Sequence, residues 1–84
     1  MNSIDDIILI ILANTDGTVE DISSTTGIRK EAVYHILEFL TAAGIVKKEN
    51  DRYYVDETIR TIAQLMLDLN DLEFYDINIL KNSN

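Results

Sequence analysis

Five of the seven cationic side chains in this sequence fall within one stretch of 24 residues, and Lys and Arg are the side chains that bind phosphate. They are Arg29, Lys30, Lys47, Lys48 and Arg52. Residues 29–52 have a net charge of +1, whereas residues 1–28 have −5 and residues 53–84 have −4, which together give −8. The folded geometry decides whether the five cations form a patch.

Two of these cations, Arg29 and Lys30, stand where a helix is expected to begin. A helix start favours an acidic or hydroxyl cap, so two cations there cost roughly 0.5–2 kcal/mol of capping. A phosphate docked at that end would meet backbone N–H groups and both cations together. The alternative is that Glu31, with Glu20 or Asp21, relieves the repulsion and nothing binds.

The sequence gives little support for a metal site or a catalytic site. The sequence has no Cys and one His, His35, which excludes a disulfide framework and a structural zinc site. It shows no Ser/His/Asp arrangement and no phosphate-cradling glycine loop, so we expect neither an enzyme nor a cofactor. The adjacent acids all fall at expected helix starts, where carboxylates are favourable, and are interpreted as caps: Asp5 and Asp6, Glu20 and Asp21, Asp56 and Glu57.

Size and charge narrow the choice of partner. Eighty-four residues make one domain near the size at which a monomer buries too little surface, so a dimer is expected. The net charge of −8 opposes indiscriminate binding of polyanions. The longest apolar run, "IILIILA" at residues 7–13, is too short for a bilayer span and lacks the flanks of a signal peptide. We therefore expect no membrane partner and an intracellular, cytoplasmic protein, in the host cytoplasm if it is viral.

Three helices are expected to position the first pair of cations. Ser3 and Thr18 are each followed three residues later by Asp, a pattern that predicts helix starts at about residues 4 and 19. Residues 14–17 are expected to be a turn. Gly27 suits a left-handed turn, with Ile28 in the core below it. The third helix is expected over about residues 30–43, with Lys30, Glu31, Tyr34, His35 and Glu38 facing solvent and Val33, Ile36, Leu37 and Leu40 facing inward.

The remaining cations belong to a predicted hairpin over residues 45–55. Asn50 and Asp51 suit its two-residue turn, and one of Tyr53 and Tyr54 is expected to pack on the core. A long amphipathic helix then begins after Asp56, with Leu65 and Leu72 on the flank of its apolar stripe. Residues 73–80 could continue that helix past a kink near Asn70, form a separate short helix, or form an edge strand.

This order of elements resembles the winged helix-turn-helix domain of small regulators such as the MarR-like and ArsR-like proteins. The resemblance covers roughly residues 4–56 and is most specific from "TVEDISSTTGIRK" to "AAGIVKKENDRYYV", with its glycine turn, "AG" helix end and two-stranded wing. It implies a mostly α fold with a small β-hairpin wing. Residues 1–56 would be the winged helix-turn-helix domain, and residues 57–84 a C-terminal amphipathic helix and tail for dimerisation.

The resemblance also implies a function and a set of contacts. The third helix would enter the major groove of double-stranded DNA, with the wing on the flanking backbone, in a sequence-specific transcriptional regulator of archaeal, viral or other prokaryotic origin. The residues facing DNA would be Arg29, Lys30, Glu31, Tyr34, His35, Lys47, Lys48 and Arg52. The sequence departs from the family at Arg29, where a Ser or Thr cap is usual, at Glu38, where a base is common, and at Phe39, where a polar residue is usual.

Two questions remain open at the level of the sequence. Burial of the last helix across a two-fold axis would make a homodimer through Ile59, Ile62, Met66 and Leu69; alternatively, this helix folds back over its own domain and leaves a monomer. The other reading of the function is an acidic winged-helix adaptor that binds protein and not DNA. Its contacts would be Phe39, Thr41 and Ala42, or the last helix.

Overall fold

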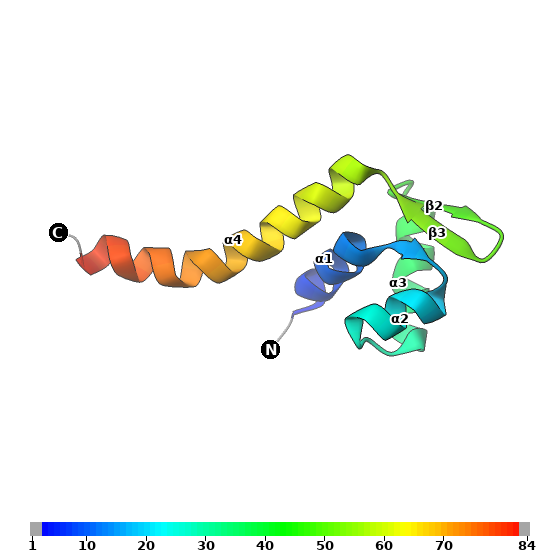
Figure 1. Cartoon of the computed structure of the whole chain (residues 1–84), viewed down its shortest axis with the longest axis horizontal. Helices are drawn as coiled ribbons and strands as arrows, with labels where there is room; N and C mark the ends of the chain where they lie inside the picture. The colour runs from blue at the N-terminus through cyan, green and yellow to red at the C-terminus, as the bar shows by residue number, and fades with distance from the viewer. Residues whose placement is uncertain (1–2, 83–84) are drawn as a thin grey trace.

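The computed structural model describes the backbone of residues 3–82 and the side chains of residues 3–70. Over this range the chain forms four helices and a three-stranded sheet (Figure 1). The elements are α1 (Ile4–Asn14), β1 (Asp16–Gly17), α2 (Val19–Thr26), α3 (Lys30–Ala42), β2 (Val46–Glu49), β3 (Arg52–Val55) and α4 (Glu57–Asn82). The mostly α fold class with a small β-hairpin wing is confirmed. None of the helices, within the described residues, is long and apolar enough to cross a membrane.

The first two helices begin where their caps predict. The Ser3 hydroxyl accepts a hydrogen bond from the Asp6 N–H at 3.2 Å. At α2 the Thr18 hydroxyl accepts from the Asp21 N–H, and the Asp21 carboxylate accepts from the Thr18 N–H, both at 3.1 Å. This reciprocal pair satisfies two backbone donors that a helix start leaves free. Gly27 ends α2 in the left-handed conformation, with φ of 77°, as expected.

The sheet has the order β1-β3-β2 and is antiparallel throughout. The hairpin closes through Asn50 and Asp51, with Glu49 opposite Arg52, so the two-residue turn is confirmed. Asn50 has φ of 57°, a conformation that Asn tolerates. The expectation for residues 14–17 was incomplete: Asp16 and Gly17 do turn the chain, but they also pair with Tyr54 and Tyr53 as a third strand. A strand of two residues is too short to show alternation in the sequence.

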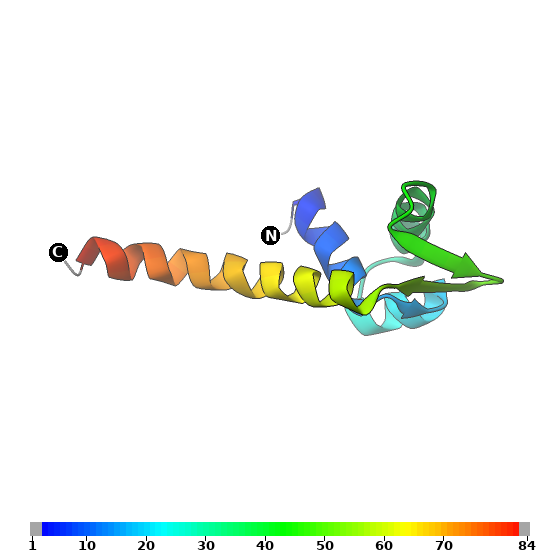
Figure 2. The ribbon, with the colours of Figure 1, turned by 90° about the horizontal axis from the view of Figure 1, so that it is seen from above.

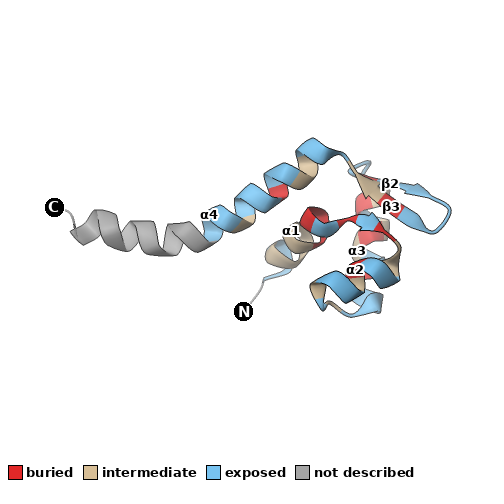
Figure 3. Ribbon diagram, in the orientation of Figure 1, coloured by how far each residue is buried: buried red, intermediate tan, exposed pale blue. Residues whose placement is uncertain are grey.

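One core lies between the helices and the sheet (Figure 3). From α3 it takes Val33, Leu37 and Leu40, with Ile36 partly buried beside them, as the helical spacing predicted. Ile28 also packs against it. Tyr53 is the buried member of the tyrosine pair, while Tyr54 is half-buried. The other buried residues are Ile11, Leu12, Ala13, Thr15, Ile22, Val46 and Ala63.

The helix α4 packs along α1 through its first turns (Figure 2). Ala63 is buried, Ile59 and Leu67 are partly buried against the core, and the Gln64 amide donates to the Ala13 carbonyl at 3.4 Å. This side of α4 therefore completes the fold of its own chain. The bounds of α4 exclude an edge strand and a separate helix over residues 73–80. The Leu72 side chain lies outside the described residues.

The wing and α4 extend from the core in opposite directions (Figures 1 and 2). The overall extents are 55 × 24 × 19 Å. A surface on α3 and the wing is therefore remote from the far part of α4.

Candidate nucleic-acid interface

The N-terminus of α3 is exposed and has no side-chain cap. Arg29 occupies the cap position with extended backbone, φ −60° and ψ 143°, and its side chain makes no capping hydrogen bond. The Arg29 Nε lies 3.8 Å from the Glu31 Oε1, and both side chains are more than 70% exposed. Lys30 is exposed and forms no ion pair among residues 3–70. Glu31 thus partly neutralises Arg29 and leaves Lys30 available.

The outward face of α3 continues with two aromatic side chains. Tyr34 and His35 are exposed, and their rings meet edge to face with centroids 5.4 Å apart. They lie one turn beyond Lys30 and Glu31 because the core takes Val33 and Leu37 on the other side of the helix. This face offers hydroxyl, imidazole, ammonium and carboxylate groups to a partner.

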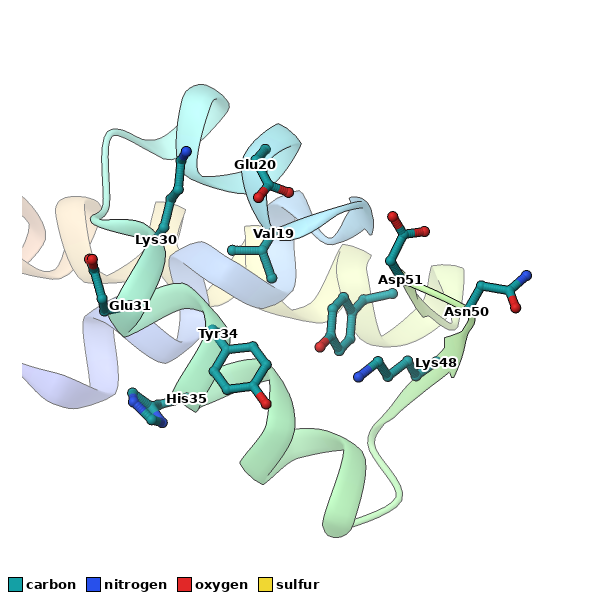
Figure 4. A pocket seen from close by; sticks show the side chains of 10 residues that line it. Val19, Glu20, Lys30, Glu31, Tyr34, His35, Lys48, Asn50 and Asp51 are labelled. Atoms are coloured by element: carbon teal, nitrogen blue, oxygen red, sulfur yellow. The ribbon is translucent and has the colours of Figure 1, made fainter.

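A cleft of about 550 Å³ separates this face from the wing (Figure 4). Figure 4 shows Lys30 and Glu31 at one end, Asn50 and Asp51 at the other, and Tyr34 between them. The full lining is Val19, Glu20, Lys30, Glu31, Tyr34, His35, Lys48, Asn50, Asp51 and Tyr53. The cleft therefore brings together five of the eight predicted DNA contacts: Lys30, Glu31, Tyr34, His35 and Lys48. Sequence reasoning did not anticipate Asn50 and Asp51 there, because it assigned them to the turn alone.

The wing is tied to α3 through Glu38, which the sequence placed toward solvent. Its Oε2 accepts hydrogen bonds from the Lys48 ammonium at 2.9 Å and from the Tyr53 hydroxyl at 2.5 Å. The Lys48 Nζ also lies 5.2 Å from the centroid of the Tyr53 ring. The Tyr53 hydroxyl and then Lys48 lower the pKa of Glu38, and Glu38 in turn raises the pKa of Lys48. Glu38 is on the outer side of α3 as expected, with its side chain 37% exposed, but its pairing with Lys48 and Tyr53 was not predicted.

The other two wing cations lie outside the cleft lining. Lys47 precedes Lys48 on β2, so its side chain leaves the opposite face of the hairpin, beside Tyr54, Asp56 and Ile59. The Arg52 guanidinium lies 4.0 Å from the Asp21 carboxylate. Asp21 thus faces Arg52 on the wing, whereas the sequence offered it as a partner for Arg29 and Lys30.

Asp21 is held in its charged form by its cap. The Thr18 N–H is the main cause of the lowered pKa of this carboxyl, followed by the Thr18 hydroxyl group, while Arg52 contributes less. A group that already accepts a backbone hydrogen bond and faces a guanidinium has little reason to take up a proton. Asp21 therefore stays ionised beside the wing.

The four residues predicted to form a dimer interface divide between two sides of α4. Ile62, Met66 and Leu69, together with Leu65, each expose between 47% and 59% of their surface. Ile59 is instead partly buried against its own core. Within residues 57–70, intramolecular packing therefore covers one side of α4 and leaves an apolar stripe exposed on another.

No metal site is formed by three or more His, Asp or Glu side chains within the part of the chain that the structure describes. The side chains that line the cleft can pair charges, form hydrogen bonds and make aromatic contacts. These are the interactions by which a protein binds the edges of bases and the phosphates beside them.

A short helix, a glycine turn, an exposed second helix and a two-stranded wing together define a winged helix-turn-helix domain, the class expected from the sequence. The family model described as sugar-specific transcriptional regulator TrmB matches residues 7–61. The chain therefore belongs to the TrmB family and is a DNA-binding transcriptional regulator. No curated protein matches the sequence.

Proposed function

We propose that this regulator binds a specific DNA sequence as a homodimer, with α3 in the major groove and the β2–β3 wing on the flanking backbone. The observation that carries the proposal is the cleft that Lys30, Tyr34 and His35 share with Lys48 on the wing. A major groove about 12 Å wide admits a helix, and the outward face of α3 offers groups that can bond base edges. The proposed contacts remain Arg29, Lys30, Glu31, Tyr34, His35, Lys47, Lys48 and Arg52.

The α3 N-terminus is the proposed phosphate contact. Arg29 makes no capping hydrogen bond and its partner Glu31 is exposed at 3.8 Å, a distance at which water screens the attraction. A phosphate at this end can therefore replace Glu31 and also accept from the free backbone N–H groups. The charge of −8 works against binding elsewhere, so few contacts and a moderate dependence of affinity on salt are expected.

We propose that the apolar stripe of α4 joins two copies of the chain. Ile62, Leu65, Met66 and Leu69 follow one another at spacings of three, one and three, the pattern by which one helix packs against another. A second copy presents the same stripe, which satisfies the self-complementarity that a two-fold dimer requires. In this proposal residues 1–56 bind DNA, and residues 57–84 serve dimerisation while their first turns also cover α1.

Selection of binding sites from a random duplex library tests the DNA contacts. The wild type should enrich an inverted repeat at near-physiological salt, and the Arg29→Ala/Lys30→Ala variant should enrich none. Lys30→Ala and Arg60→Ala provide a matched pair, since each removes one cation and Arg60 lies on α4. Equal affinity of these two single variants for the enriched site would refute the role of the α3 N-terminus.

Sedimentation equilibrium tests the dimer. Leu69→Glu places a charge in the stripe and should yield a monomer, whereas Thr61→Glu adds the same charge to an exposed position about a quarter turn away on α4 and should leave a dimer. A monomeric wild type, or a dimer that survives Leu69→Glu together with Met66→Glu, would refute this interface.

A protein partner is the second candidate function, and one observation favours it. Phe39 on α3 is 64% exposed, and Ala42 beside it is also exposed, whereas Thr41 is half-buried with its hydroxyl bonded to the Leu37 carbonyl. Phe39 and Ala42 would be the contacts of such an adaptor. Phe39→Ser should abolish capture of the partner and leave DNA binding intact, while Arg29→Ala/Lys30→Ala should do the reverse.

A further inference from the structure

Glu38 occupies an unexpected place for a carboxylate on a helix that is proposed to enter DNA. It lies on α3 one turn beyond Tyr34, at the edge of the face that the proposed function turns toward phosphates. An unpaired carboxylate there would repel DNA. Glu38 is instead paired: one of its two oxygens accepts from both the Lys48 ammonium and the Tyr53 hydroxyl. The pairing spans two elements, since Glu38 belongs to α3 and its two donors to β2 and β3.

The pairing has a consequence for the wing. Lys48 and Tyr53 face each other across the hairpin, and one carboxylate holds both. The Tyr53 ring is anchored in the core, so its hydroxyl gives Glu38 a fixed position, and Glu38 then holds Lys48 over the same ring. The strands β2 and β3 are in this way fastened to α3 near the middle of the hairpin. This contact adds to the core packing of Val46 and Tyr53 in setting the spacing between the wing and α3.

The pairing also has a consequence for charge. Lys48 lies 2.9 Å from Glu38, a shorter contact than Arg29 makes with Glu31 at 3.8 Å or Arg52 with Asp21 at 4.0 Å. A phosphate that binds Lys48 must first separate it from a hydrogen-bonded carboxylate of the same chain. Replacing the Glu38 carboxylate by a DNA phosphate at Lys48 therefore adds little free energy of binding. Lys48 is therefore a weaker source of phosphate affinity than its sequence position implies.

We propose that Glu38 is a positioning and specificity-determining residue of the DNA interface, which fixes the wing against α3 and withholds the Lys48 charge from phosphates. This inference rests on the proposed function. It assigns Lys48 to the wing's attachment in place of the phosphate contact proposed above. Arg29 and Lys30 at the α3 N-terminus and Lys47 on the wing are then the cations that meet the backbone directly; Lys30 and Lys47 form no ion pair within residues 3–70. Affinity for DNA of arbitrary sequence falls as a result, which raises the ratio of specific to nonspecific binding.

The test measures affinity for a random-sequence duplex as a function of salt concentration. Glu38→Gln keeps an oxygen that accepts from Tyr53 but frees the Lys48 charge, so it should bind more tightly, with the slope of log affinity against log salt steeper by about 0.9, one phosphate contact. Glu38→Gln/Lys48→Ala should return to the wild-type slope. Glu49→Gln is the matched control, since it makes the same charge change on the same wing at a residue with no ion pair among residues 3–70.

Two results would overturn the proposal while the proposed function stands: a slope for Glu38→Gln equal to that of Glu49→Gln, or a raised slope that persists in the double variant. Lys48→Gln keeps the test decisive if Glu38→Gln does not fold. Its slope should equal that of the wild type, and a slope flatter by about 0.9 would show that Lys48 already contacts phosphate. A wild type that binds no duplex at any salt concentration would refute the proposed function itself. Amide NMR shifts of residues 46 and 47, which are not adjacent to position 49, should move in Glu38→Gln and not in Glu49→Gln; they report the position of the wing without DNA.

Discussion

At the scale of single residues, Tyr53 joins the core to the outer surface of α3. Its ring is buried among apolar side chains, while its hydroxyl reaches the edge of α3 and donates to Glu38 at 2.5 Å. Burial is the main cause of the raised pKa of the hydroxyl, and the adjacent Glu38 carboxylate raises it further. The hydroxyl therefore stays protonated and remains a donor near neutral pH. The hydroxyl of a buried tyrosine stabilises the fold only where it has a hydrogen-bond partner, which here is Glu38.

Tyr53→Phe should lower the free energy of unfolding by about 0.5–1.5 kcal/mol, because it removes one hydrogen bond and leaves the ring in place. Urea unfolding followed by circular dichroism measures the change. Tyr34→Phe is the control, since the Tyr34 ring is exposed and its hydroxyl makes no hydrogen bond among the described residues. An equal loss in both variants would mean that the Tyr53 hydroxyl contributes no stability through Glu38.

Asp21 makes stability depend on pH. Its pKa in the folded chain lies below the ordinary value, chiefly because its carboxylate accepts the Thr18 N–H, so the folded state favours the charged form. The stability from Asp21 is therefore complete above the unfolded pKa of about 3.9 and is lost as pH falls through the folded pKa. Asp21→Asn should consequently lose less stability than the wild type between neutral pH and about pH 3. The measurement is the free energy of unfolding of both proteins at a series of pH values. Curves of equal slope for the wild type and Asp21→Asn would contradict the assignment to Asp21.

At the scale of elements, the turn between α1 and α2 is constrained by both neighbours. Gly17 pairs with Tyr53 in the sheet and has φ of 140°, a conformation that other residues rarely adopt. A Cβ at this position would lie 2.7 Å from the Asp21 Oδ2, the atom that accepts the Thr18 N–H in the capping box. Because Gly17 has no Cβ, it can pair with Tyr53 in strand β1 while the Asp21 carboxylate accepts the Thr18 N–H beside it.

Gly17→Ala should therefore destabilise the protein more than Gly44→Ala. Both positions have positive φ, which costs roughly 1–2 kcal/mol for a residue with a Cβ. A Cβ at Gly44 meets nothing within 4 Å, whereas at Gly17 it must displace the Asp21 carboxylate. Thermal unfolding of the two variants compares them directly. If the melting temperature of Gly17→Ala were equal to or higher than that of Gly44→Ala, the Asp21 carboxylate could move aside without loss of stability.

At the scale of the whole molecule, the wing and α4 point away from each other along the long axis (Figures 1 and 2). The wing and α3 lie toward one end, and α4 extends toward the other (Figure 1). The exposed stripe of Ile62, Leu65, Met66 and Leu69 lies on the described part of α4. Dimerisation through α4 would place two recognition helices in one assembly without covering either. The stability of the folded chain and the spacing of the two DNA half-sites would then both depend on the same stripe.

The melting temperature of the wild type should accordingly rise with protein concentration, because association stabilises the folded chain by mass action. Its footprint on an enriched site should contain two half-sites about 34 Å apart, one helical turn of DNA. Leu69→Glu should remove both the concentration dependence and the second half-site, whereas Thr61→Glu should retain them. If a monomeric variant still protected two half-sites, the spacing of the half-sites would not depend on dimerisation through α4.

The sequence by itself determined the local features of this protein: the helix starts at Ser3 and Thr18, the left-handed end of α2 at Gly27 and the turn at Asn50 and Asp51. Each depends on atoms within about one helical turn or one hairpin loop, so residue types and spacing suffice to predict it. The resemblance of these local features to the winged helix-turn-helix then predicted the fold and the cations of the site.

Only the tertiary structure decided how distant segments meet. It paired Asp16 and Gly17 with β3, gave Glu38 the partners Lys48 and Tyr53 that stand 10 and 15 positions away, and turned one side of α4 toward α1. Such contacts depend on the packing of the whole chain, because a surface carboxylate and a paired one look the same in a helical pattern, as do the two apolar sides of a long helix.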